Sequence, residues 1–159
     1  MDELTTTEGQ QRLAVLLRSH VERCLQQIWQ TTDLVVDADG DYPYRVGTAA
    51  CWVSVCPDPP QVRVFGYAAR GLRPTTSLLR EVTDLNARSR WAKVVLEAGI
   101  VQVRVDLHWS AVDRPALARA VQAVGQVADE VGTLLASLHG GHTPFPPETV
   151  THDTTEEAA

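Results

Sequence analysis

The stretch VVLEAGIVQVRVDLH, Val94 to His108, decides the fold class of this chain. In its second half apolar residues occupy the odd positions from Val101 to Leu107, and polar residues occupy the even positions from Gln102 to His108. A period of two residues predicts a β-strand with one buried and one polar face. Ala98 and Gly99 form a two-residue turn between this strand and the apolar run before it. We therefore expect an antiparallel hairpin.

A helix is expected directly before the hairpin, from about Thr75 or Thr76 to about Ser89. A threonine hydroxyl can cap its first turn, and apolar residues recur at helical spacing along it. Four of them share one face: Leu78, Leu79, Val82 and Leu85. This face is left over once two other helices cover the sheet, so we expect it to form the interface of a homodimer.

Three short β-type runs precede that helix, over 44–46, 49–56 and 61–67. The connection CPDPPQ between the last two predicts a turn, because prolines donate no ladder hydrogen bonds and Asp58 favours turn geometry. The three runs are expected to form an antiparallel meander.

Longer amphipathic helices are expected at both ends of the domain, from about Glu8 to Gln30 and from about Asp113 to Leu138. Gly125 and Gly132 lie seven residues apart in the second of these helices. With Ala118 they form a narrow stripe of small residues, where another backbone could approach closely; alternatively, they are tolerated helix glycines, each costing about 1 kcal/mol relative to alanine.

The chain is therefore expected to be α+β, in the order α-β-β-β-α-β-β-α, with one antiparallel five-stranded sheet. The first and third helices should cover a single face of the sheet, because both need a shared core. One domain should span residues 1–139, since 159 residues are short for two domains. Residues 140–159 are rich in proline and end acidic, so we expect this tail to be disordered.

Charge and composition restrict the possible partners. The formal net charge is -6 and the isoelectric point is near 5.3, which argues against a nucleic acid partner. The acidic start is unlike a secretory signal, and no apolar run approaches membrane-spanning length, so a cytoplasmic protein with no membrane partner is expected. Cys24, Cys51 and Cys56 are an odd count without CxxC spacing, which fits reduced structural thiols.

No pattern in the chain indicates catalysis, a cofactor or a metal site. DADGD, Asp37 to Asp41, begins like a calcium loop, but Tyr42 stands where an EF-hand needs glycine and Thr48 where it needs glutamate. The five histidines form no HxxxH pair, and there is no GxSxG, phosphate loop or dinucleotide fingerprint. We therefore expect a protein that is not an enzyme.

The segment LNARSRWAK, Leu85 to Lys93, could hold a phosphate or simply join a helix to a strand. Arg88 lies four residues after Asp84, the order that favours a helix ion pair. Lys93 alternates with Val94 on the first hairpin strand, which is a solvated edge position. Trp91 at this corner is expected to be a packing anchor. Because each of these residues has a local structural reason, the linker interpretation is favoured.

Several segments resemble the YbjN-like and type III secretion chaperone-like family, in particular its actinobacterial peptide-binding members. They are GDYPYRVG, PQVRVFGYAARGL, LLREVTDLNARSRWAKVVLEAGIVQVRVDL and LARAVQAVGQVADEVGTLLASL, with DLNAR followed by the alternating hairpin the most specific. The resemblance covers residues 13–138. It implies a non-enzymatic protein, usually a homodimer, that holds a segment of a client protein.

Two functions remain open: a chaperone-like module that binds a client segment, and a regulatory or structural module in a fixed complex. The two-residue period places Trp52 opposite the valines of its strand, with Arg63, Phe65 and Tyr67 likewise on the next strand and Arg104 from the hairpin. Such an aromatic and cationic surface suits an extended segment that is both acidic and apolar. Alternatively, Trp52 fills the core or the dimer interface.

Overall fold

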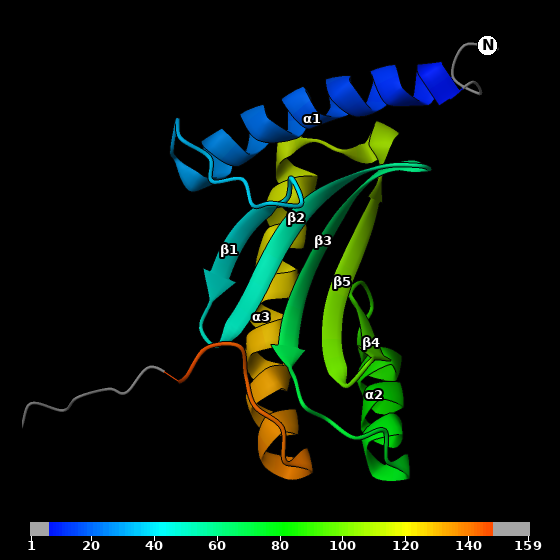
Figure 1. The fold of residues 1–159 in the computed structure, drawn as a ribbon, viewed down its shortest axis with the longest axis vertical. Coiled ribbons are helices and arrows are strands. Elements are labelled where there is room, and N and C mark those ends of the chain that lie inside the picture. The colour runs from blue at the N-terminus through cyan, green and yellow to red at the C-terminus, as the bar shows by residue number, and fades with distance from the viewer. Residues whose placement is uncertain (1–6, 148–159) are drawn as a thin grey trace, which may run out of the picture.

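The computed structural model describes residues 7–147, which form one antiparallel sheet with helices packed behind it (Figure 1). The elements are α1 (Thr7–Trp29), β1 (Tyr42–Val46), β2 (Ala49–Pro57), β3 (Pro60–Ala69), α2 (Thr76–Arg88), β4 (Lys93–Glu97), β5 (Ile100–His108), the 3-10 turn η2 (Trp109–Ala111) and α3 (Arg114–His139). The predicted α+β class and element order are confirmed. Thr75 and Asp113 cap α2 and α3 with their side-chain oxygens, as expected.

The five strands lie in the order β1-β2-β3-β5-β4, and all neighbouring pairs are antiparallel. Ala98 and Gly99 both have positive φ, 50° and 76°, and Glu97 pairs with Ile100. This is the two-residue turn that the hairpin pattern predicts, with alanine tolerated in a left-handed conformation that usually favours asparagine or glycine. Among strands that are neighbours in the sheet, only β3 and β5 are far apart in the sequence, because α2 and β4 lie between them.

The core occupies one side of the sheet. It combines the odd-numbered positions of β2 and β5 and the even-numbered ones of β3 with apolar residues of α1, α2 and α3. Val53, Val64, Val101, Val103 and Leu117 are fully inaccessible to solvent. Figure 1 shows α3 behind the strands and α1 across one end of them. The expectation that α1 and α3 share a face is confirmed, and α2 packs against β4 on this same side.

The small residues of α3 let this helix lie close to the sheet. A Cβ atom on Gly132 would overlap the carbonyl oxygen of Ala68, and one on Gly125 would overlap Val46. On the sheet, a Cβ atom on Gly66 would overlap the Cys51 sulfur and lie tightly against Ala128 of α3. The predicted stripe therefore packs against β3 and β1.

The turn between β1 and β2 is fastened to α3 by a buried polar contact. The Asp129 carboxylate accepts hydrogen bonds from the Thr48 amide at 2.7 Å and from the Thr48 hydroxyl at 2.8 Å. Gly47 has a φ of 52°, and a side chain there would collide with Asp129. This contact fixes the β1 edge of the sheet over the helix.

The apolar face of α2 differs from the expectation of a free dimer surface. Leu78 is fully buried in the core of its own chain, and Val82 and Leu85 are partly buried against that core. Leu79, which is 49% exposed, is the only one of the four that faces solvent. Most of this face packs on β4 and the core of its own chain, and the homodimer itself stays a prediction.

Two further expectations need correction. Residues 140–147 follow a defined path: Arg70 and His142 form an isolated β-bridge, and the Phe145 amide donates to the Thr48 carbonyl at 3.0 Å. Disorder was expected from 140 onward; residues 148–159 lie outside the described part. Trp91 is 45% exposed, so it is not the packing anchor that its position suggested.

Candidate functional site

The face of the sheet opposite the helices carries the residues predicted to bind a partner. We call it the open face; its members are Pro43, Arg45, Ala50, Trp52, Ser54, Cys56, Gln61, Arg63, Phe65, Tyr67, Lys93, Val95, Glu97, Ile100, Gln102, Arg104, Asp106 and His108. None of these residues belongs to the core cluster. The sheet in Figure 1 is seen from this side.

One row of side chains crosses all five strands of the open face. Its members are directly opposite one another in the register, in the order Pro43, Trp52, Phe65, Arg104 and Lys93. The row therefore changes from apolar at β1 to cationic at β4. The neighbouring row runs from Arg45 through Ala50, Tyr67 and Gln102 to Val95.

Three aromatic rings cluster at the centre of the open face. Trp52 stacks on Phe65, with ring centroids 5.3 Å apart and an interplanar angle of 18°. Tyr67 contacts both rings, at 4.9 Å from Trp52 and 6.0 Å from Phe65, and the Arg70 guanidinium lies over the Tyr67 ring at 5.1 Å. All three aromatic residues are half-buried. Trp52 is thus held by its neighbours on the open face rather than in the core.

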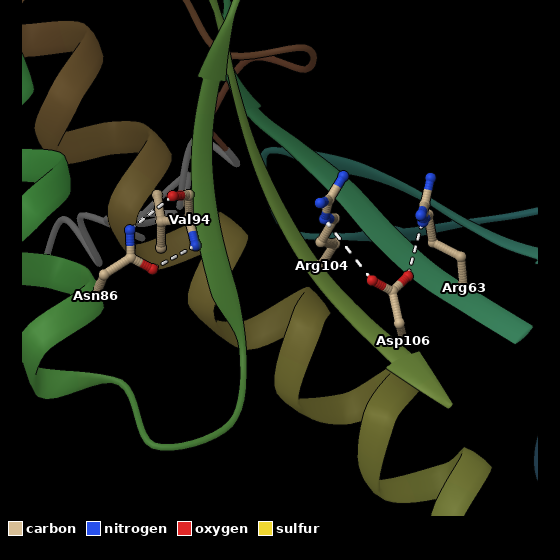
Figure 2. Close-up of polar contacts among 5 residues, drawn as sticks. All are labelled: Arg63, Asn86, Val94, Arg104 and Asp106. Atoms are coloured by element: carbon tan, nitrogen blue, oxygen red, sulfur yellow. Dashed lines mark hydrogen bonds and ion pairs between the residues drawn. The ribbon is translucent and has the colours of Figure 1, made fainter. Parts of the chain in front are cut away.

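The open face is cationic although the chain is acidic. Among its described members, Arg45, Arg63, Lys93 and Arg104 are basic, and only Glu97 and Asp106 are acidic. Arg63 Nε donates to Asp106 Oδ1 at 2.7 Å, whereas Arg104 Nε is 3.9 Å from Oδ2 of the same carboxylate (Figure 2). The hydrogen bond to Asp106 raises the pKa of Arg63 above its ordinary value. Asp106 is therefore mainly engaged by Arg63.

Arg104 and Lys93 are less well compensated. The Arg104 Nε atom is buried without a hydrogen-bond partner in the described structure. Lys93 is exposed, directly opposite Arg104, and makes no hydrogen bond or ion pair with any described residue. Two like charges directly opposite each other on a sheet are unfavourable. Apart from the Asp106 carboxylate, which Arg104 shares with Arg63, no described carboxylate forms an ion pair with these two cations.

Beside the cationic end of the row, a shallow hollow of about 210 Å³ lies at the turn between β4 and β5. It is lined by Tyr67, Glu97, Ala98, Ile100 and Gln102. The hollow continues the open face toward the hairpin tip and is too small for most drug-sized ligands, which occupy roughly 300 to 1,000 Å³.

The predicted partner-binding residues Trp52, Arg63, Phe65, Tyr67 and Arg104 do share this face. Sequence reasoning placed Lys93 at a solvated strand edge and did not place it beside Arg104. It also did not anticipate that Asp106 engages Arg63. The position of Lys93 beside Arg104 could be found from the hairpin turn, because a two-residue loop at 98–99 sets Lys93 opposite Arg104.

No group of three histidine, cysteine or carboxylate side chains within 7–147 is arranged to hold a metal ion. Burial raises the pKa of Cys51 to about 12 and also raises that of Cys24, so these thiols stay protonated at neutral pH. The five-residue turn at 37–41 is closed by its own backbone, with the Asp37 carboxylate accepting from the amides of Asp39 and Asp41. None of the helices in this region is long and apolar enough to cross a membrane.

Residues 16–147 match the model of the family described as "T3SS (YopN, CesT) and YbjN peptide-binding chaperone 1". The chain belongs to this family. The family resemblance read from the sequence is thereby confirmed. No curated protein matches the chain in sequence.

The fold of this peptide-binding chaperone family member is also found in a solved structure, the crystal structure of the ExsC-ExsE complex. The TM-score is 0.59 with 12% sequence identity, and the match covers 74% of this chain and 94% of the other. At this identity the similarity concerns the fold alone.

Proposed function

We propose that this protein is a chaperone-like module that binds an extended segment of a client protein on its open face. The observation that carries the proposal is the cluster of Trp52, Phe65 and Tyr67. These large rings lie half-buried on a sheet face that no described helix covers. Family membership supports a peptide ligand, since the matching model describes peptide-binding chaperones.

The aromatic cluster has the physical properties of a binding surface. A partner that covers these rings removes apolar area from water, which contributes about 25 cal/mol for each Å² buried. Arg63 and Arg104 beside the rings add hydrogen-bond donors for a backbone carbonyl or a carboxylate. An extended segment fits better than a compact ligand, because the surface is broad and its hollow is small.

We propose further that the protein acts in the cytoplasm, without catalysis and as a homodimer. The matching family is one of peptide-binding chaperones, which supports a role without catalysis, and the acidic chain disfavours nucleic acid. If the dimer uses α2, Leu79 is the side chain of the predicted face that is free to contribute. A second copy on the open face would make the protein a fixed-complex module instead.

The proposal is tested with a random twelve-residue peptide library displayed on phage. Peptides selected by the wild-type protein are synthesised, and their Kd is measured for wild type, Trp52→Ala and the control Trp109→Ala. Trp109 is at the surface in η2, away from the three-ring cluster. We expect binding that is lost in Trp52→Ala and retained in Trp109→Ala.

Thermal unfolding of each variant shows whether Trp52→Ala still folds. Where it does not, Phe65→Leu provides a milder change of the same surface. No selectable peptide, or selected peptides that bind both tryptophan variants equally, would refute binding on the open face.

A further inference from the structure

We propose that the client segment carries an acidic residue about three residues from its apolar anchor, and that Arg104 and Lys93 select this acid. The inference rests on the proposed function and specifies the chemistry of its ligand. It follows from the cross-strand row in which Trp52 and Phe65 are succeeded by Arg104 and Lys93.

The cationic end of the row carries an excess of positive charge. Asp106 is shared between two arginines, but its short contact at 2.7 Å is to Arg63, and Arg104 Nε is 3.9 Å away. The three side chains together carry one net positive charge, and Lys93 opposite Arg104 adds another. A carboxylate placed between Lys93 and Arg104 would relieve the repulsion of this pair.

The aromatic and the cationic halves of the row lie at a set distance from each other across the strands. Trp52 and Phe65 stand on β2 and β3, and Arg104 and Lys93 stand on β5 and β4, which are the next two strands. The centre of each pair is two strand spacings from the centre of the other, or about 9.6 Å. An extended segment in the polyproline II conformation rises about 3.1 Å per residue and returns to the same face every third residue. An apolar residue and an acid at positions i and i+3 therefore match the row.

The charge of the chain and the composition of the row together restrict the class of ligand. A polyanion such as a nucleic acid would gain from the cations here but would be repelled by a chain of net charge -6. The cationic part is also small, and it adjoins three aromatic rings rather than further cations. A protein segment with one or two carboxylates beside an apolar side chain matches both parts of the row.

The test uses the tightest peptide from the phage selection, in which a single glutamate is walked from one to seven residues on either side of the apolar anchor. Matched peptides carry glutamine at the same positions. Each peptide is titrated against wild type, Lys93→Gln/Arg104→Gln and the control Arg63→Gln/Asp106→Asn. The control removes two charges from the same face without changing its net charge.

We expect the glutamate three residues from the anchor to bind wild type about tenfold more tightly than glutamine does, the size of one charge-assisted hydrogen bond. Lys93→Gln/Arg104→Gln should abolish this preference, so that its glutamate and glutamine peptides bind alike, whereas the control should retain the preference. The preference should also weaken with added salt.

Equal affinity for the glutamate and glutamine peptides would overturn the inference while leaving the proposed function intact, provided that both still depend on Trp52. A preference for glutamate seven residues away would overturn the extended geometry, because that spacing fits a helix. Tighter binding to phosphatidylserine vesicles than to any peptide would overturn the choice of a protein ligand.

Discussion

Asn86 of α2 and Val94 of β4 are joined by a reciprocal pair of hydrogen bonds. Asn86 Nδ2 donates to the Val94 carbonyl at 2.7 Å, and the Val94 amide donates to Asn86 Oδ1 at 2.8 Å (Figure 2). The side-chain amide thus pairs with the outer edge of β4 as another strand would. It explains why an asparagine stands in the DLNAR segment at the end of the helix, and it partly closes one edge of the sheet.

Asn86→Ala should lower the free energy of unfolding by about 1 to 3 kcal/mol, because it leaves two backbone groups of Val94 without this partner. Urea denaturation measures the loss, and amide exchange of Val94 should accelerate. Thr83→Ala on the exposed side of the same helix is the control. If Asn86→Ala matched Thr83→Ala in stability, the pairing would not contribute to the fold.

Gly132→Ala should destabilise the protein by about 1 to 3 kcal/mol, although alanine favours helices, because the added methyl group would overlap the Ala68 carbonyl. Thermal and urea unfolding check this, with the exposed neighbour Thr133→Ala as control. An increase in stability would show that α3 and β3 are not packed as closely as described.

Stability should fall as the pH rises from about 9 to 12. Burial, together with the hydrogen bond to Glu22, raises the pKa of Tyr42 from 10.0 to about 12, and burial raises the pKa values of Cys51 and Tyr44. In this range the unfolded chain loses protons that the folded chain keeps, so deprotonation favours unfolding. Below this range the contribution of these groups is fully present.

Tyr44→Phe should flatten this dependence, because phenylalanine cannot titrate. Urea midpoints between pH 8 and pH 11.5 provide the measurement for wild type and variant. A midpoint that stays constant or rises over this range would contradict the burial of these groups.

Cys56 should be the thiol that reacts in the folded protein. It lies half-buried on the open face, whereas Cys24 and Cys51 are 5% and 1% exposed and have raised pKa values. Ellman's reagent at pH 8 should therefore modify about one thiol rapidly and all three after denaturation. Rapid modification in the Cys56→Ser variant would show that a buried cysteine is accessible.

The sequence was sufficient for most of the fold because the period of two residues and the turn residues are local signals. The β4–β5 register follows from the turn at Ala98 and Gly99, so even the opposition of Lys93 and Arg104 is encoded locally. The pairing of Phe65 with Arg104 is not encoded locally, because α2 and β4 lie between their strands in the sequence.

The errors also have physical reasons. The periodicity of α2 shows that Leu78 lies on an apolar face, but it does not show what covers this face. In the structure Leu78 is buried in the core of its own chain. The proline-rich segment after Gly140 has no period, yet its backbone pairs with Arg70 and Thr48, and Phe145 lies under the Arg45 guanidinium at 4.3 Å. Such contacts depend on positions brought together only by the finished fold.

Photo-crosslinking tests the central claim, that a client segment binds the open face, most directly. Benzoylphenylalanine is placed at Ser54, beside Trp52 on the open face, and separately at Arg80 on the exposed side of α2, and each protein is irradiated with a selected peptide. We expect one product, of one chain plus one peptide, from Ser54 and none from Arg80. A peptide linked at Arg80 but not at Ser54, or a Ser54 product made of two protein chains, would contradict it.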